Sequence, residues 1–170
     1  MYKKILVPVD GSEPSRLGLA EAINIAKSQG SQLRLLHIVN EFIFDYTYSP
    51  MPYATSLIDS MRQQGQAILD QAEKQVRDAG LVPECVLLET IGGSAAEGIL
   101  REAAKCTADL IVMGTHGRRG LARLALGSDA EQVVHESPAP VLVVRSPATK
   151  NKPEQEHSRF VGRVAELHGV

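Results

Sequence analysis

The sequence predicts a single doubly wound α/β domain in which a five-stranded parallel sheet is flanked by four helices. Short apolar runs alternate with helical patterns along the chain, in the order β-α-β-α-β-α-β-α-β. The runs are nearly continuous and rich in β-branched residues, as strands buried on both faces of a parallel sheet are. Strands separated by helices require crossover connections, which cover both faces of the sheet. The length of 170 residues, 44% of them hydrophobic, suits one domain with a full core.

The first half of the chain is expected to supply two strands and two helices. Strands are expected at residues 4–9 and 33–39, and helices at residues 12–27 and 57–80. Ser12 and Pro14 open the first helix, and Gly30 stops it. Between the second strand and the second helix, residues 40–56 are predicted to form a long loop that holds most of the aromatic side chains. Loops of this length usually have a function or are disordered.

The second half of the chain is expected to supply three strands and two helices. Strands are expected at residues 82–89, 109–113 and 141–145, and helices at residues 94–106 and 129–136. Ser94 with Glu97, and Ser128 with Glu131, have the spacing of capping boxes that start these two helices. Pro138 follows the last helix and stops it.

The predicted domain covers residues 1–147, and residues 148–170 form a C-terminal tail. The stretch after residue 146 is polar and has the composition of a linker. Residues 158–168 then contain apolar side chains at helical spacing, which fit a short amphipathic helix. A loosely ordered tail and a docked helix both fit this pattern.

Composition excludes several classes of protein. The formal net charge of −2 gives no reason to expect binding to nucleic acid or to an anionic membrane. No stretch approaches the roughly 18 apolar residues of a membrane span, and the N-terminus lacks the features of a signal peptide. Cys85 and Cys106 stand singly in apolar surroundings, so we expect reduced core thiols rather than a disulfide. Together these features predict a cytoplasmic protein.

The most informative stretch is GTHGRRGLARLALGS, residues 114–128, which joins the fourth strand to the fourth helix. Glycine lets a ligand approach the backbone closely, and a helix N-terminus offers unpaired N–H groups with a partial positive charge. A glycine-rich turn that leads into a helix is therefore a natural phosphate site. Gly114 and Gly117 would free the backbone beyond the strand, and Gly127 with Ser128 would present N–H groups at the helix. The alternative is a flexible turn with Ser128 as an ordinary N-cap.

Other motifs are absent. The chain has no Gly-Lys pair of the P-loop kind and no G-x-G-x-x-G. It also has no CxxC and no HExxH, so no built-in metal site is expected. His116 lies in the glycine-rich stretch without a visible nucleophile, which favours an exposed loop histidine over a catalytic base. His37, on the second strand, is expected to be a satisfied buried or edge histidine.

The spacing Gly-x2-Gly-x9-Gly-Ser after an apolar strand, followed by PVLVVR (140–145), resembles the nucleotide-binding signature of the universal stress protein family. ILVPVDGSEPS (5–15) resembles the family's first strand and Asp-Gly-Ser turn, and residues 92–120 resemble its third-helix to fourth-strand region. The resemblance covers residues 2–145. It implies an adenine nucleotide alpha hydrolase-like fold, a dimer that pairs strand 141–145 across a two-fold axis, and ATP binding.

The resemblance also implies the residues of the nucleotide site. Asp10 would accept a hydrogen bond from ribose or base, and the backbone of Val39 would meet the adenine edge. The implied binding residues are Pro8, Val9, Asp10, Val39, Met113, Gly114, Gly117, Arg118, Gly127, Ser128 and Asp129. The alternatives are that Asp10 caps the first helix, in competition with Ser12, and that Arg118 lies on a solvated loop face.

Two functions of different kinds are consistent with these features. The first is a cytoplasmic, dimeric, ATP-binding stress-response or regulatory module, with ATP carried as its Mg²⁺ complex and hydrolysed slowly if at all. The second is an interaction protein that binds AMP, a cyclic nucleotide or no nucleotide. It would regulate a partner such as a transporter or kinase through loop 40–56 or the tail. A hydrolase or nucleotidyl transferase on the same fold is a third alternative.

Overall fold

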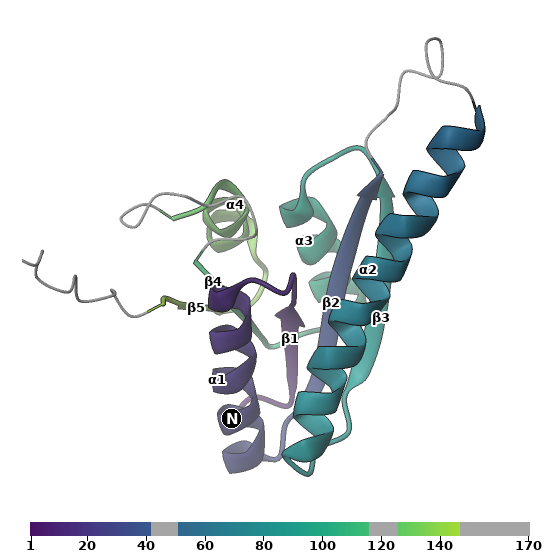
Figure 1. Cartoon of the computed structure of the whole chain (residues 1–170). Coiled ribbons are helices and arrows are strands. Elements are labelled where there is room, and N and C mark those ends of the chain that lie inside the picture. Colours follow the sequence, from purple (N-terminus) through teal and green to yellow (C-terminus); the bar gives the residue numbers. More distant parts are fainter. Residues whose placement is uncertain (42–50, 116–125, 147–170) are drawn as a thin grey trace, which may run out of the picture.

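Helices and strands alternate through the chain in the computed structural model, which describes residues 1–41, 51–115 and 126–146 (Figure 1). The elements are β1 (Lys4–Pro8), α1 (Glu13–Gln29), β2 (Gln32–Glu41), α2 (Met51–Asp78), β3 (Glu84–Ile91), α3 (Ala95–Cys106), β4 (Leu110–Gly114), α4 (Ser128–Glu136) and β5 (Val141–Val144). The expected order of five strands and four helices is therefore confirmed. The tail and most of the predicted loop lie outside the described residues.

The five strands form one parallel sheet in the order β3-β2-β1-β4-β5. Helices α1 and α2 cover one face, where Ile5, Val7 and Leu35 of the sheet pack against Leu19 and Leu69. Helices α3 and α4 cover the other face around a second set of buried residues: Leu6, Leu36, Ala96, Ile99, Ala103, Ile111, Met113, Ala130 and Val133. Because β1 and β4 have helices on both faces, their side chains are buried along nearly the whole strand.

Helix α2 begins earlier than the sequence pattern predicts. The pattern assigns residues 51–56 to the long loop, but the helix starts at Met51. Pro52 is the second residue of this helix. A proline in the first turn costs no hydrogen bond, because the first N–H groups of a helix have no partner within it. The N-terminal turns of α2 extend beyond the carboxyl end of β2 (Figure 1).

Two glycines allow α1 to lie directly on β4. A Cβ atom at Gly114 would lie 2.7 Å from the carbonyl carbon of Pro14 and 2.8 Å from the backbone nitrogen of Ser15. A Cβ atom at Gly18, on the facing helix, would lie 3.3 Å from the carbonyl carbon of Met113. Gly114 does not have a positive φ. Gly114 is therefore not needed for a left-handed conformation, and its role in the fold is to allow close contact between backbones.

Candidate functional site at the carboxyl edge of the sheet

The strand order places a reversal between β1 and β4. From β1 the chain moves outward to β2 and β3, and it then crosses back to β4 and β5 on the other side. The carboxyl ends of β1 and β4 are therefore neighbours at one edge, and the chain leaves them in opposite directions. In doubly wound sheets, ligands bind at this position. Pro8, Met113 and Gly114 stand at these two strand ends, with Val9 and Asp10 directly beyond β1.

The turn after β1 is fixed by hydrogen bonds of its own. The Ser12 N–H donates to Asp10 Oδ1 at 2.9 Å, and the Asp10 N–H donates to Ser15 Oγ at 3.2 Å. Gly11 between them has φ +78°, a conformation that favours glycine. Ser12 Oγ accepts from the Ser15 N–H, so Ser12 is the N-cap of α1. The alternative in which Asp10 caps this helix is excluded, and the Asp10 carboxylate is instead held at the carboxyl edge.

The start of α4 receives no side-chain cap from the described residues. The N-cap residue is Gly127, whose carbonyl accepts the first helical hydrogen bond from the Glu131 N–H at 2.8 Å. The predicted capping box at Ser128 and Glu131 is therefore wrong, because the helix begins one residue earlier. By contrast, Ser12 caps α1 and Ser94 caps α3 through side-chain oxygens. The first-turn N–H groups of α4 suit an anion, and Gly127 is held beside β4 by its N–H bond to the Thr115 carbonyl.

The Asp129 carboxylate points toward a neighbouring helix. Its Oδ1 accepts from the Ala96 N–H, in the first turn of α3, at 3.3 Å. The Ser94 hydroxyl adds a second link to α4 by donating to Gln132 Oε1 at 3.1 Å. These bonds fix the first turn of α4 against the first turn of α3. The carboxylate of Asp129 therefore bonds the start of α3, and only its backbone N–H belongs to the first-turn N–H groups of α4.

The end of β2 presents a different backbone group from the one expected. The Val9 N–H donates to the Leu36 carbonyl at 2.8 Å, so even-numbered residues of β2 direct their peptide groups toward β1. Val39 therefore directs its N–H and C=O toward β3, and its side chain is buried. Ile38 directs its peptide N–H and C=O toward the β1 side of β2, beyond the point where the chain turns away from the sheet after Val9. Sequence reasoning missed Ile38, because strand pairing decides which side a peptide group faces.

His37 contacts the backbone of the candidate site from the face of the sheet that α2 covers. Its Nδ1 lies 2.6 Å from the Val9 carbonyl oxygen, and the side chain is buried beneath α2. A Cβ atom at Gly65 of α2 would lie 2.7 Å from His37 Cδ2 and 3.0 Å from Val39 Cγ2. The helix can approach because this position is glycine. The prediction of a satisfied, buried histidine is confirmed.

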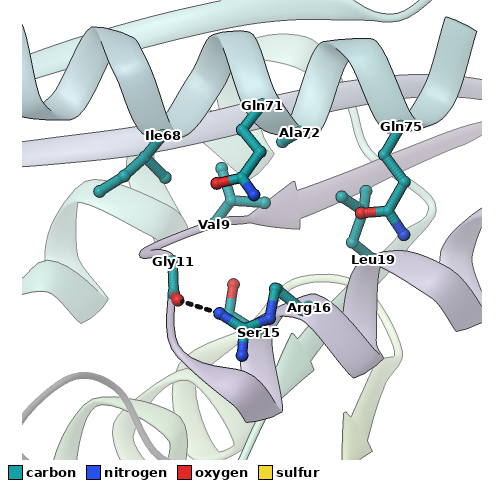
Figure 2. Close-up of a pocket in the computed structure, with 9 residues that line it drawn as sticks. All are labelled: Val9, Gly11, Ser15, Arg16, Leu19, Ile68, Gln71, Ala72 and Gln75. Atoms are coloured by element: carbon teal, nitrogen blue, oxygen red, sulfur yellow. Dashed lines mark hydrogen bonds between the residues drawn. The ribbon is translucent and has the colours of Figure 1, made fainter.

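A separate small cavity lies on the other side of the turn, between α1 and α2 (Figure 2). Its volume of about 30 Å³ admits only water-sized molecules, so it is too small for a nucleotide. Its rim carries the Arg16 guanidinium, which donates to the Gly11 carbonyl at 2.8 Å, and the amides of Gln71 and Gln75. Apart from Val9, none of the predicted site residues lines this cavity.

Several predicted features are not covered by the described structure. Gly117, Arg118 and His116 lie outside the described residues. Within residues 1–41, 51–115 and 126–146 there is no group of three His, Cys, Asp or Glu side chains that could hold a metal ion. Within the same ranges, no helix has the length and hydropathy needed to cross a membrane.

The fold and the sequence match known proteins over most of the chain. Residues 1–145 match the model of the universal stress protein family. A universal stress protein of Methanocaldococcus jannaschii is 37% identical over 148 residues, which cover 86% of this chain and 84% of that protein. The solved structure of UspA from Lactobacillus plantarum aligns with a TM-score of 0.74 at 28% identity, covering 85% of this chain and 98% of that chain.

Two more distant solved structures share the fold and hold nucleotides. A universal stress protein in complex with cAMP aligns with a TM-score of 0.64 at 24% identity, covering 86% of this chain and 99% of that chain. A universal stress protein of Archaeoglobus fulgidus in complex with dAMP aligns with a TM-score of 0.63 at 22% identity, covering 84% and 98%. The family match over 145 residues is decisive by itself, and the chain belongs to the universal stress protein family.

Proposed function

We propose that this protein binds ATP at the carboxyl edge of its sheet, between the turn after β1 and the start of α4. The proposal rests mainly on the N-terminus of α4. Among the described residues no side chain caps it, and it is held beside the reversal of strand order, next to the Asp10 turn. An uncapped helix start at a strand-order reversal suits a phosphate group, since N–H groups and the helix dipole both favour a negative charge.

In this proposal each end of the nucleotide meets a different set of residues. Gly127, Ser128 and the Asp129 N–H would contact the phosphates, together with Gly117 and Arg118. The Asp10 carboxylate would accept a hydrogen bond from the ribose, because the Ser12 N–H already orients its other oxygen.

The nucleoside end would meet apolar surface and backbone. Pro8, Val9 and Met113 would flank the adenosine with Gly114. The Ile38 peptide group, which faces the β1 side of β2 beyond Val9, takes the place first assigned to Val39 at the adenine edge.

The Mg²⁺ of the ATP complex would be held mainly by the phosphates. This fits the donor set, because the described residues supply no cluster of metal-ligating side chains at the edge. A cation with few protein ligands is usual for Mg²⁺, which keeps several waters and binds nucleotide oxygens.

Family relatives support an adenine nucleotide. Proteins of this fold bind cAMP in one case and dAMP in another. ATP is proposed for this chain because its glycine spacing, Gly114-x2-Gly117-x9-Gly127-Ser128, resembles the nucleotide-binding signature of the family, and a glycine-rich turn that leads into a helix suits phosphate groups. We further propose that the protein acts as a cytoplasmic dimeric regulatory module, in which bound ATP changes the surface that a partner protein meets.

Substitution of Gly127 by valine tests the phosphate end of the site. Gly127 has φ −67° and ψ 150°, which any residue can adopt, so Gly127→Val should fold. We expect loss of ATP binding in isothermal titration calorimetry at concentrations that saturate the wild type, because the branched side chain would occupy the phosphate position.

The matched control is Ala104→Val, which adds bulk on the exposed side of α3, away from the carboxyl edge of the sheet. It should bind ATP as the wild type does. Equal ATP affinity of Gly127→Val and the wild type would overturn the assignment of the phosphate site.

The second candidate is an interaction protein that binds AMP or a cyclic nucleotide. The cAMP complex of a relative is the observation that favours it. The two candidates are separated by the nucleotide that copurifies, identified by mass spectrometry after denaturation. Because the chain has no Trp, copurified nucleotide would also raise the absorbance at 260 nm clearly above that of the protein.

A further inference from the structure

Two neighbouring side-chain oxygens at the carboxyl edge are buried and have no hydrogen-bond partner among the described residues. They are Oδ1 of Asn40, at the end of β2, and Oγ1 of Thr90, at the end of β3. The two residues are partners in the register of these strands, so their side chains lie side by side on the same face of the sheet. Buried polar atoms without a partner are rare and unfavourable, and their presence at a proposed ligand site points to the ligand.

The orientation of the Asn40 amide is determined by the backbone of the next loop. Asn40 Nδ2 donates to the Gly93 carbonyl oxygen at 2.7 Å. Exchange of the amide oxygen and nitrogen would place two acceptor oxygens against each other, so only one orientation is stable. Asn40 therefore presents Oδ1, an acceptor that cannot donate, away from Gly93.

Apolar side chains lie on the same face of the sheet, on the N-terminal side of this pair. Ile38 and Leu88 are also register partners and precede Asn40 and Thr90 by two residues, on the same face. Both pack against α3 at Gly98, where a Cβ atom would lie 2.8 Å from Ile38 Cδ1 and 3.4 Å from Leu88 Cδ2. A donor is therefore not supplied from the Ile38 and Leu88 side, whereas the carboxyl edge, where the proposed nucleotide lies, is the opposite side of the pair.

We propose that Asn40 and Thr90 select adenine by accepting hydrogen bonds from its exocyclic amino group. This inference rests on the proposed function, and it adds the specificity of the base. Ile38 and Asn40 are two residues apart on β2. A base that bonds the Ile38 peptide group would therefore lie next to Asn40 Oδ1. An amino group carries two N–H donors, which match two acceptor oxygens.

Bases with a carbonyl oxygen at the same position are disfavoured. Guanine and hypoxanthine would place that oxygen against Asn40 Oδ1, and the amide cannot turn without losing its bond to Gly93. A buried acceptor facing another acceptor discriminates between bases, because the single O–H of Thr90 can serve only one of the two oxygens and leaves the other without a donor. The wild type should therefore bind ATP more tightly than inosine triphosphate, which replaces the amino group by a carbonyl oxygen.

The test compares the affinities for ATP and for inosine triphosphate in the wild type, Asn40→Leu and Thr90→Val. Both substitutions remove the oxygen and keep the branched shape of the side chain, and Asn40→Leu also removes the amide N–H that bonds Gly93. We expect the preference of the wild type for ATP to be at least about tenfold, and to fall by about tenfold in Asn40→Leu, which corresponds to one good hydrogen bond. Asn24→Leu, on the exposed side of α1, is the matched control and should keep the wild-type ratio.

The outcomes separate this inference from the proposed function. If the wild type binds ATP and both variants lose affinity for the two nucleotides equally, a bound water satisfies the two oxygens and the inference is overturned while ATP binding stands. If the wild type binds neither nucleotide, the proposed function fails and the inference fails with it. Thr90→Val keeps the test open should Asn40→Leu not fold, since it leaves the Asn40–Gly93 bond in place.

Discussion

At the scale of single residues, neighbours on other elements decide what each side chain does. Asp129 looks from the sequence like a group that could stand near phosphates, but its carboxylate accepts from the Ala96 N–H. Cys85 looks like a core thiol, but it lies at the sheet edge and is exposed, whereas Cys106 is buried as expected. The sequence cannot supply these assignments, because each depends on contacts between residues that are far apart along the chain.

Cys85 is predicted to be an unreactive thiol despite its exposure. Partial desolvation raises the pKa of Cys85 to about 11, and the negative charge of Glu73 on α2 contributes to the higher pKa. The thiolate is the reactive form, so alkylation by iodoacetamide should be slow at about pH 8 and accelerate only as the pH approaches the raised pKa. Glu73→Gln should lower the pKa and speed this alkylation, measured by peptide mass mapping.

The control for this prediction is Glu21→Gln, which removes a carboxylate from the exposed side of α1. It should leave the rate at Cys85 unchanged. A Cys85 that titrates near the ordinary thiol value in the wild type, with no effect of Glu73→Gln, would contradict the environment described for this thiol.

At the scale of elements, the ends of helices and strands show which features can be predicted from neighbouring residues and which depend on the rest of the fold. The capping of α1 by Ser12 and of α3 by Ser94 is predictable from the sequence, because a cap involves residues three positions apart. The sequence pattern starts β3 at residue 82, but the strand begins at Glu84, since Val82 is exposed and Pro83 has no N–H for a ladder.

The contact between α1 and β4 predicts unequal effects of two glycine substitutions. Gly114→Ala should lower the free energy of unfolding by about 1–3 kcal/mol, because its Cβ would meet backbone atoms at 2.7 and 2.8 Å. In Gly18→Ala the new Cβ would lie 3.3 Å from the Met113 carbonyl carbon, which is a milder contact. Alanine also gains roughly 1 kcal/mol of helix propensity over glycine, so the free energy of unfolding should hardly change.

Urea denaturation followed by circular dichroism measures both glycine variants. A neutral Gly114→Ala would show that α1 and β4 can move apart at no cost. Close contact between the two backbones would then no longer explain the glycine at this position.

At the scale of the whole molecule, the sequence predicts the alternation of elements and therefore the fold class. It does not predict which strand ends meet, because five parallel strands can be ordered in several ways. The observed order brings together the carboxyl ends of β1 and β4 and leaves β3 and β5 at the edges. This strand order determines where the proposed nucleotide site lies. The roles proposed for Ile38, Asn40 and Thr90 follow only from strand register.

The edge strand β5 is the proposed dimer contact. Ile111 and Thr115 donate to the Pro140 and Val144 carbonyls, so even-numbered residues of β5 face β4 and Val143 directs its peptide group outward. Val143→Pro removes an outward N–H and leaves the bonds to β4 intact. We expect wild type at twice the chain mass of 18.4 kDa in analytical ultracentrifugation, and Val143→Pro at the monomer mass.

Leu87→Pro, on the opposite edge strand β3, is the matched control for the dimer. Its peptide group also faces outward, and the variant should remain dimeric. If Val143→Pro stays dimeric as well, the two subunits meet through another surface.

Binding of ATP at the carboxyl edge is tested most simply by isothermal titration of the nucleotide-stripped wild type with Mg-ATP, with GTP and AMP as controls. We expect micromolar binding of ATP, weaker binding of AMP because the start of α4 contacts the terminal phosphates, and weaker binding of GTP. ATP binding should also raise the melting temperature, since a ligand that binds only the folded state stabilises it. No heat and no thermal shift with ATP would contradict the proposed site and show that the start of α4 and the Asp10 turn serve only the fold.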